Sequence, residues 1–146
     1  MKHYQPMKAK GSTLDFLSDD EYESLLYLAA ETYGAGDFLR AEFLLQGLNQ
    51  LHPNDSRPYK LLGALNLLQR RHAQAEEFFV RALDRDPDDP YVLVALAELK
   101  LKSIQIEAAV PLFERLFSLD PTHPAVVRGR TLVMEYYGRL AGGHAA

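Results

Sequence analysis

The sequence contains no cysteine and no long apolar run. Without cysteine, the chain can form no disulfide framework and offers no thiolate as a nucleophile or metal ligand. A transmembrane helix needs about 18 or more consecutive apolar residues, and no segment approaches that length. Residues 1–10 carry basic side chains, but no apolar stretch follows them, so we do not expect a secretory signal. These absences favour a cytoplasmic protein.

An excess of positive charge is also missing. The formal net charge is −4, and nucleic acid is not an expected partner because phosphate binding needs a basic face. Hydrophobic residues make up 47% of the chain and charged residues 25%, which is typical of a soluble globular protein. A chain of 146 residues is long enough for one domain with a core and short for two.

The sequence also lacks catalytic and metal-binding motifs. It has no Gly-rich phosphate loop and no nucleophile motif of the G-x-S-x-G type. Its histidines are scattered over expected turns and termini, and no two have the i, i+4 spacing of a helical metal site. The acidic segment 84–89 lacks the glycine and the terminal glutamate of a calcium loop. We therefore expect no enzyme activity, no metal ion and no cofactor.

Proline, small and large apolar residues recur with a fixed period. Three prolines stand 34 residues apart, at Pro53, Pro87 and Pro121. Four further columns share this spacing: Ala41, Ala75 and Ala109; Ala29, Gly63 and Ala97; Leu28, Leu62 and Leu96; Leu45, Phe79 and Phe113. Columns that share one register indicate a repeated structural unit. Two helices approach closely only where a small side chain meets a large one, so these columns predict packed helix pairs.

The columns resemble the tetratricopeptide repeat, which places small, aromatic and proline residues at fixed offsets. Counted in its frame, the repeats run over 22–55, 56–89 and 90–123. The second repeat departs from the frame at the turn between its helices, where Arg70 and His72 replace the usual Gly-x-Tyr. The resemblance implies an all-α solenoid of three helix pairs.

Capping residues place the helices within this frame. Ser18 and Glu21 indicate a capping box, and Pro90 and Pro124 suit first helical positions, where a missing N–H costs nothing. The expected helices span 19–34, 37–51, 56–69, 72–85, 90–102, 105–118 and 124–140. The last helix is expected to cap the open end of the solenoid.

Domain organisation follows from the same frame. The repeats and the capping helix are expected to form one domain over 19–140. Residues 1–18 are an N-terminal extension, partly disordered, in which Leu14, Phe16 and Leu17 are apolar enough to dock or to dimerise. Residues 141–146 are expected to form a disordered tail.

The resemblance to the family also places a concave groove along the first helix of each pair. The groove positions hold mainly apolar residues with charges at the edges: Leu26, Ala30, Tyr33, Lys60, Ala64, Leu67, Tyr91, Val94, Glu98 and Leu101. Leu26 and Ala30 replace the Lys and Asn of a carboxylate clamp known in one subclass, which disfavours that ligand. An apolar floor suits an extended peptide with a few apolar anchors. In the alternative interpretation, Leu67, Leu68 and Leu101 belong to the core between helices.

Several stretches carry a narrower similarity: Gly11-Ser12-Thr13, Leu25 to Ala29, Asp55-Ser56-Arg57, Leu62-Gly63-Ala64 and Asp86 to Pro90. Together with the N-terminal extension, three repeats and a final helix, they resemble the class II chaperones of type III secretion systems. The resemblance implies a cytoplasmic holdase that binds an apolar secreted translocator until export, with a possible homodimer and no membrane insertion. A generic repeat scaffold that joins subunits of a larger protein assembly is the alternative.

Overall fold

The computed structural model describes residues 17–143 and divides the chain into two compact units, residues 1–53 and 54–146. Residues 1–16 lie outside the described part. They include the segment expected to be disordered and the apolar residues Leu14 and Phe16. The described residues form seven helices and no strand. None of these helices combines the length and the apolar character needed to cross a membrane.

The first unit is one helix pair, α1 (Asp19–Gly34) and α2 (Phe38–Leu51). The predicted capping box begins α1, because Ser18 Oγ accepts from Glu21 N at 3.2 Å and Glu21 Oε2 accepts from Ser18 N at 2.8 Å. The small residues Ala29 and Ala41 are fully buried where the two helices pack. This unit therefore has the small-residue contact that the repeat pattern predicts.

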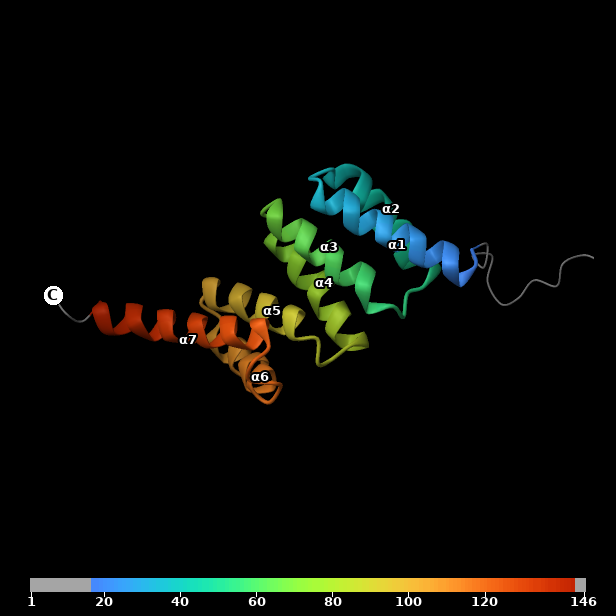
Figure 1. The fold of residues 1–146 in the computed structure, drawn as a ribbon. Coiled ribbons are helices and arrows are strands. Elements are labelled where there is room, and N and C mark those ends of the chain that lie inside the picture. Colours follow the sequence, from blue (N-terminus) through green and yellow to red (C-terminus); the bar gives the residue numbers. More distant parts are fainter. Residues whose placement is uncertain (1–16, 144–146) are drawn as a thin grey trace, which may run out of the picture. The chain divides into compact units, whose positions relative to one another are not determined.

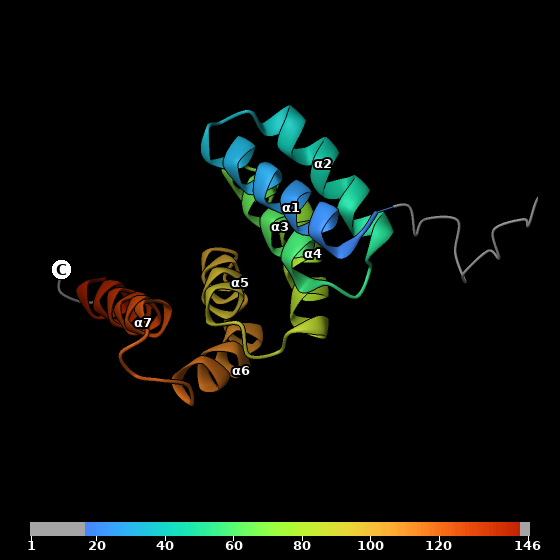
Figure 2. The ribbon, with the colours of Figure 1, turned by 45° about the vertical axis from the view of Figure 1, so that its right-hand side comes forward.

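The second unit contains the other five helices (Figure 1). They are α3 (Ser56–Leu68), α4 (His72–Arg85), α5 (Pro90–Lys102), α6 (Ile106–Phe117) and α7 (Pro124–Gly142). Helix α3 pairs with α4 and α5 pairs with α6, while α5 also packs against α4. Helix α7 packs against α5 and α6, and Figure 2 shows these three helices together at one end of the second unit. The all-helical repeat fold is confirmed. The observed helix bounds differ from the expected ones by at most one residue, except at the end of α7, which is two residues longer than expected and reaches into the expected tail.

Close contact between a small and a large residue holds α3 against α4. A Cβ added to Gly63 would lie 2.5 Å from Cε1 of Phe79, closer than real Cβ contacts allow. Phe79 is 2% exposed and belongs to a core cluster with Tyr59, Ala75 and Leu96. The glycine column is therefore a packing requirement of this helix pair.

In each repeat, the turn between the two helices has one residue in the left-handed conformation, at the same position of the repeat. Gly36, Arg70 and Ile104 have φ angles of 80°, 60° and 58°. In each turn this residue donates to a carbonyl three residues back, at 3.0 Å, and the next residue donates to a carbonyl five residues back. The second repeat thus keeps the turn although it lacks the glycine of the family pattern, because the same two backbone bonds close it.

We expect Gly63→Ala to lower the stability of the second unit. The Phe79 ring must shift to admit the new Cβ, and overpacking of this kind costs about 1–3 kcal/mol. Gly138→Ala in α7 is the matched control, since a Cβ there meets no atom within 4 Å and gains up to about 1 kcal/mol of helix propensity. Opposite shifts in the urea midpoint would support the packing interpretation, and two equal shifts would contradict it.

We expect Ile104→Gly to raise the stability of the second unit by about 0.5–1 kcal/mol. The left-handed conformation costs an L-residue roughly 1–2 kcal/mol, and the greater freedom of glycine in the unfolded chain offsets part of the gain. Ser103→Gly is the control, because Ser103 has a φ of −88° and needs no glycine. Denaturation in urea measures both, and a gain in the control as large as in Ile104→Gly would refute the argument from backbone strain.

Candidate functional site

Three predicted groove residues share one face of α3. Lys60, Ala64 and Leu67 follow the i, i+4, i+7 spacing of a helical stripe. Their side chains are all half-buried, whereas Leu62, on the opposite side of α3, is fully enclosed. The α3 stripe therefore remains accessible after the helix has packed.

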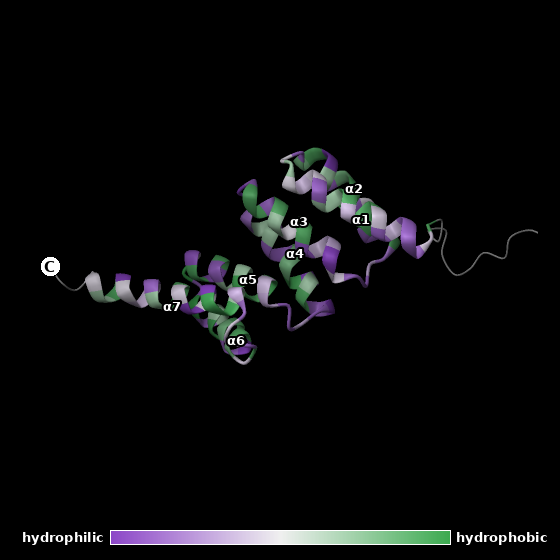
Figure 3. Cartoon of the chain, viewed as in Figure 1, coloured by the Kyte–Doolittle hydropathy of each residue, from purple (hydrophilic) through white to green (hydrophobic). Residues whose placement is uncertain are grey.

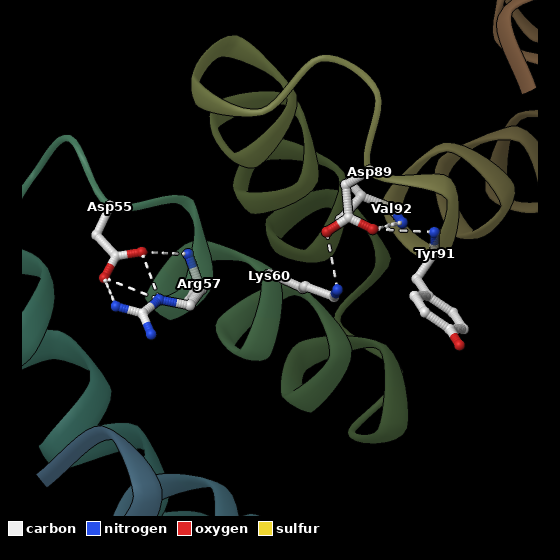
Figure 4. A network of polar contacts seen from close by, with 6 residues as sticks. All are labelled: Asp55, Arg57, Lys60, Asp89, Tyr91 and Val92. Carbon is white, nitrogen blue, oxygen red and sulfur yellow. Dashed lines mark hydrogen bonds and ion pairs between the residues drawn. The ribbon is translucent and has the colours of Figure 1, made fainter. Parts of the chain in front are cut away.

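A polar cluster joins the beginning of this stripe to the beginning of α5 (Figure 4). Asp89, only 9% exposed, caps α5 by accepting from Tyr91 N at 3.0 Å and from Val92 N at 3.4 Å. Its other oxygen accepts from Lys60 Nζ at 2.8 Å, and Lys60 Nζ lies 5.0 Å from the centre of the Tyr91 ring. One carboxylate therefore starts α5 and fixes a cation over an aromatic face.

The far ends of α3 and α5 enclose a cavity of about 520 Å³ together with the start of α4. Leu67, Leu68, Ala95 and Leu99 supply its apolar lining. Its polar lining comes from Arg70, His72, Glu98 and Lys102. The accessible faces of α3 and α5 are thus adjacent at both ends.

Helix α7 extends the same surface. A second cavity, of about 250 Å³, lies between α5 and α7, with Glu98 and Leu101 on one side and Arg128 and Glu135 on the other. Glu98 Oε1 lies 3.1 Å from Lys102 Nζ and 3.2 Å from Arg128 Nη2. We call the accessible faces of these helices the first-helix surface, defined by Lys60, Ala64, Leu67, Leu68, Tyr91, Glu98, Leu101, Lys102, Arg128 and Glu135.

The structure corrects two of the predicted groove positions. Val94 is 9% exposed and packs in a core cluster with Phe113 of α6 and Val126 of α7. Leu26 on α1 is 7% exposed. Neither side chain is open to a ligand, because apolar residues at helical spacing serve the core as readily as a groove.

In the alternative interpretation, Leu67, Leu68 and Leu101 are core residues between the helices, and two of the three do contact the core. Leu67 and Leu101 are partly buried and pack against the two core clusters. Leu68 is 58% exposed. The floor of the first-helix surface is therefore continuous with the core, and Leu68 is its most exposed leucine.

The remaining predicted residues lie on α1, in the unit of residues 1–53. Ala30 and Tyr33 are half-buried, and the Tyr33 ring centre lies 6.2 Å from that of Phe38. Burial raises the pKa of the Tyr33 hydroxyl above its ordinary value. That these two residues belong to a groove stays a prediction.

The sequence analysis missed the contribution of α7, although the 34-residue register contains it. Arg128 follows Lys60 by two periods, Leu132 follows Ala64, and Glu135 follows Leu67. All three α7 residues line the second cavity. Helix α7 is thus a fourth first helix by register and the last helix of the described residues.

The chemistry of the first-helix surface suits binding. It offers apolar and aromatic side chains between ion pairs that are already satisfied within the chain. Among the described residues, no group of three or more His, Asp or Glu side chains could hold a metal ion. Such a surface can hold a peptide by apolar contacts and hydrogen bonds at its edges.

Comparisons with known proteins agree with the repeat pattern. The model of the tetratricopeptide repeat family matches residues 32–99 and 66–131. A comparison with curated proteins found no match.

Solved structures with the same fold include translocator chaperones. The type III secretion translocator chaperone SycD of Yersinia enterocolitica is 22% identical with a TM-score of 0.77, and the match covers 88% of this chain and 92% of SycD. SycD bound to a peptide of the translocator YopD has a TM-score of 0.74 at 22% identity, over 84% and 96% of the two chains. PcrH of Pseudomonas aeruginosa with the chaperone binding region of PopB is 25% identical, with a TM-score of 0.71 over 80% and 98%.

We expect Asp89→Ala to lower the stability of the second unit by about 1–2 kcal/mol, because α5 loses its N-cap and Lys60 its partner. Asp89→Asn keeps an acceptor for the free N–H groups of α5 and should cost less. Urea denaturation compares the two variants, and Lys60→Met isolates the ion pair. If Asp89→Ala unfolds at the wild-type midpoint, the capping role is wrong.

Proposed function

Because this chain belongs to the tetratricopeptide repeat family, we propose that it holds a protein client on its first-helix surface, as a cytoplasmic chaperone of a type III secretion translocator. The observation that carries the proposal is the continuous accessible face of α3, α5 and α7, in which apolar side chains lie between paired charges. Protein binding, and not catalysis, is what this arrangement favours.

The chemistry of a translocator explains why a holdase is needed. A segment that inserts into membranes is apolar and would aggregate if it were released in water. A groove with Leu68 and Tyr91 exposed can cover such a segment, since both side chains are more than half exposed, at 58% and 51%. SycD, which shares this fold, binds a peptide of the translocator YopD, and PcrH binds the chaperone binding regions of PopD and PopB.

The charges of the surface favour recognition by shape over recognition by net charge. Lys60 is neutralised by Asp89, and Glu98 pairs with both Lys102 and Arg128, whose remaining positive charge is offset by Glu135 on the same surface. A client therefore gains little from long-range attraction and depends on apolar anchors that fit between the ion pairs. This supports an apolar client over an acidic or basic tail.

Co-expression with a membrane-active translocator of the native host tests the proposal. We expect the client to stay soluble and to co-purify, and Leu68→Glu to reduce its capture at least about tenfold, since a charge in an apolar contact costs more than about 1.4 kcal/mol. Val80→Glu is the matched control, because Val80 is 43% exposed on the second helix α4.

Circular dichroism checks that both variants stay helical. Capture that is equal in Leu68→Glu and wild type would remove the first-helix surface as the binding site. Mass spectrometry of complexes purified from the native host separates the chaperone from a scaffold. A stable folded partner, with no aggregation-prone client, would favour the generic scaffold.

A further inference from the structure

By its place in the register, helix α7 is a first helix, and the described residues contain no second helix for it. Its N-cap His123 and its first residue Pro124 follow Asp89 and Pro90 by one period, and His123 Nδ1 accepts from Ala125 N at 3.1 Å. In the three complete repeats, α2, α4 and α6 pack against the first helix of the same repeat. In the described part of the chain, no helix follows α7.

Exposure shows that the partner face of α7 is uncovered. Leu93 on α5 is 1% exposed and belongs to the core cluster that α6 helps to form. Val127 follows Leu93 by one period and is 48% exposed. Met134 on the same side of α7 is 74% exposed. Helix α7 therefore has apolar side chains at positions where a packed second helix would lie.

Next to this face, α6 and α7 form an apolar cleft with a cavity of about 210 Å³. Helix α6 lines it with a stripe at spacings of four, three and four: Ile106, Val110, Phe113 and Phe117. Helix α7 adds Val133 and Tyr137. Figure 3 shows the apolar colour of α6 beside α7. We call this the α6–α7 cleft.

The cleft is open to solvent, and its α6 stripe has helical spacing. Val110 is 47% exposed, Phe117 is 38% exposed and Tyr137 is 65% exposed. A stripe at spacings of four and three matches the apolar stripe of another helix. Apolar side chains that gather in one place on a surface mark an interaction site more often than single exposed ones do.

The border of the cleft has an unbalanced negative charge. Glu107 and Glu114 stand seven residues apart on the same edge of the α6 stripe, and both are exposed. Neither has an ion pair among the described residues, in contrast to the paired Asp89 and Glu98. A ligand with basic residues along one edge therefore complements this border.

We propose that the α6–α7 cleft binds one amphipathic helix of another protein, with its apolar stripe in the cleft and Lys or Arg facing Glu107 and Glu114. The cleft shares Leu101 with the first-helix surface, but its α6 stripe lies outside that surface. The binding mode is that of a helix in a groove.

A synthetic helix tests this proposal with the full-length chain. The probe is a dye-labelled 18-residue peptide with Leu at i, i+3, i+4 and i+7 and Lys along one border, and a second peptide has Glu in place of every Lys. Fluorescence anisotropy should show binding of the Lys peptide at least about tenfold tighter than the Glu peptide. The double variant Glu107→Lys/Glu114→Lys should reverse this preference.

Two further variants locate the site. Val110→Glu should weaken binding of the Lys peptide at least about tenfold, and Val80→Glu on α4 should leave it unchanged. Leu68→Glu should also leave it unchanged, so failure of the client proposal and failure of this one give different results. If Val110→Glu unfolds, the exposed charge-reversal pair still decides.

Three outcomes would overturn the proposal. The first is equal affinity of wild type and the charge-reversal pair for the Lys peptide. The second is a loss of peptide binding in Leu68→Glu as large as in Val110→Glu, which would place the peptide on the first-helix surface. The third is a wild-type dimer in sedimentation that Val110→Glu converts to a monomer, because the cleft would then hold a second copy.

Discussion

The close approach of paired helices is the constraint on which the rest of the second unit depends. Because Gly63 has no Cβ, the Phe79 ring lies in the volume that a Cβ would fill. This contact orients α3, with Leu62 and Gly63 turned inward. Lys60 and Leu67, which lie on the side of the helix opposite Leu62, then remain accessible. The accessible face of α3 is thus a consequence of how the pair packs.

The beginnings of the helices add the polar part of the surface. Asp89 is needed as an N-cap for α5, and its second oxygen is free to hold Lys60. Asp55 caps α3 one period earlier and also pairs with Arg57 (Figure 4). Local chemistry that starts a helix therefore also fixes a cation at the edge of the groove. Because these charges are paired, a client on the proposed site would gain affinity mainly from apolar contact.

The sequence predicts features that depend on one repeat and misses those that depend on several. Ser18 and Glu21 locate the start of α1 because a capping box is local. Val94 could not be placed, because its burial depends on α7, which packs against α5 from a distant part of the chain. The left-handed Arg70 and Ile104 were missed since two backbone hydrogen bonds, and not a glycine, close their turns. Apolar residues of α6 such as Val110 resemble core until the exposure of the side chain is known.

The end of a repeat stack poses a physical problem that α7 solves only in part. A capping helix normally has a polar outer face, because no further repeat covers it. Helix α7 protects the α5–α6 core with Val126 and Leu132, yet it leaves Met134 and Tyr137 exposed at 74% and 65%. Solubility alone would favour polar residues at these positions. The exposed Tyr137 lies in the α6–α7 cleft, beside carboxylates of α6 that have no ion pair among the described residues, and it is accounted for if a helix from another protein binds there.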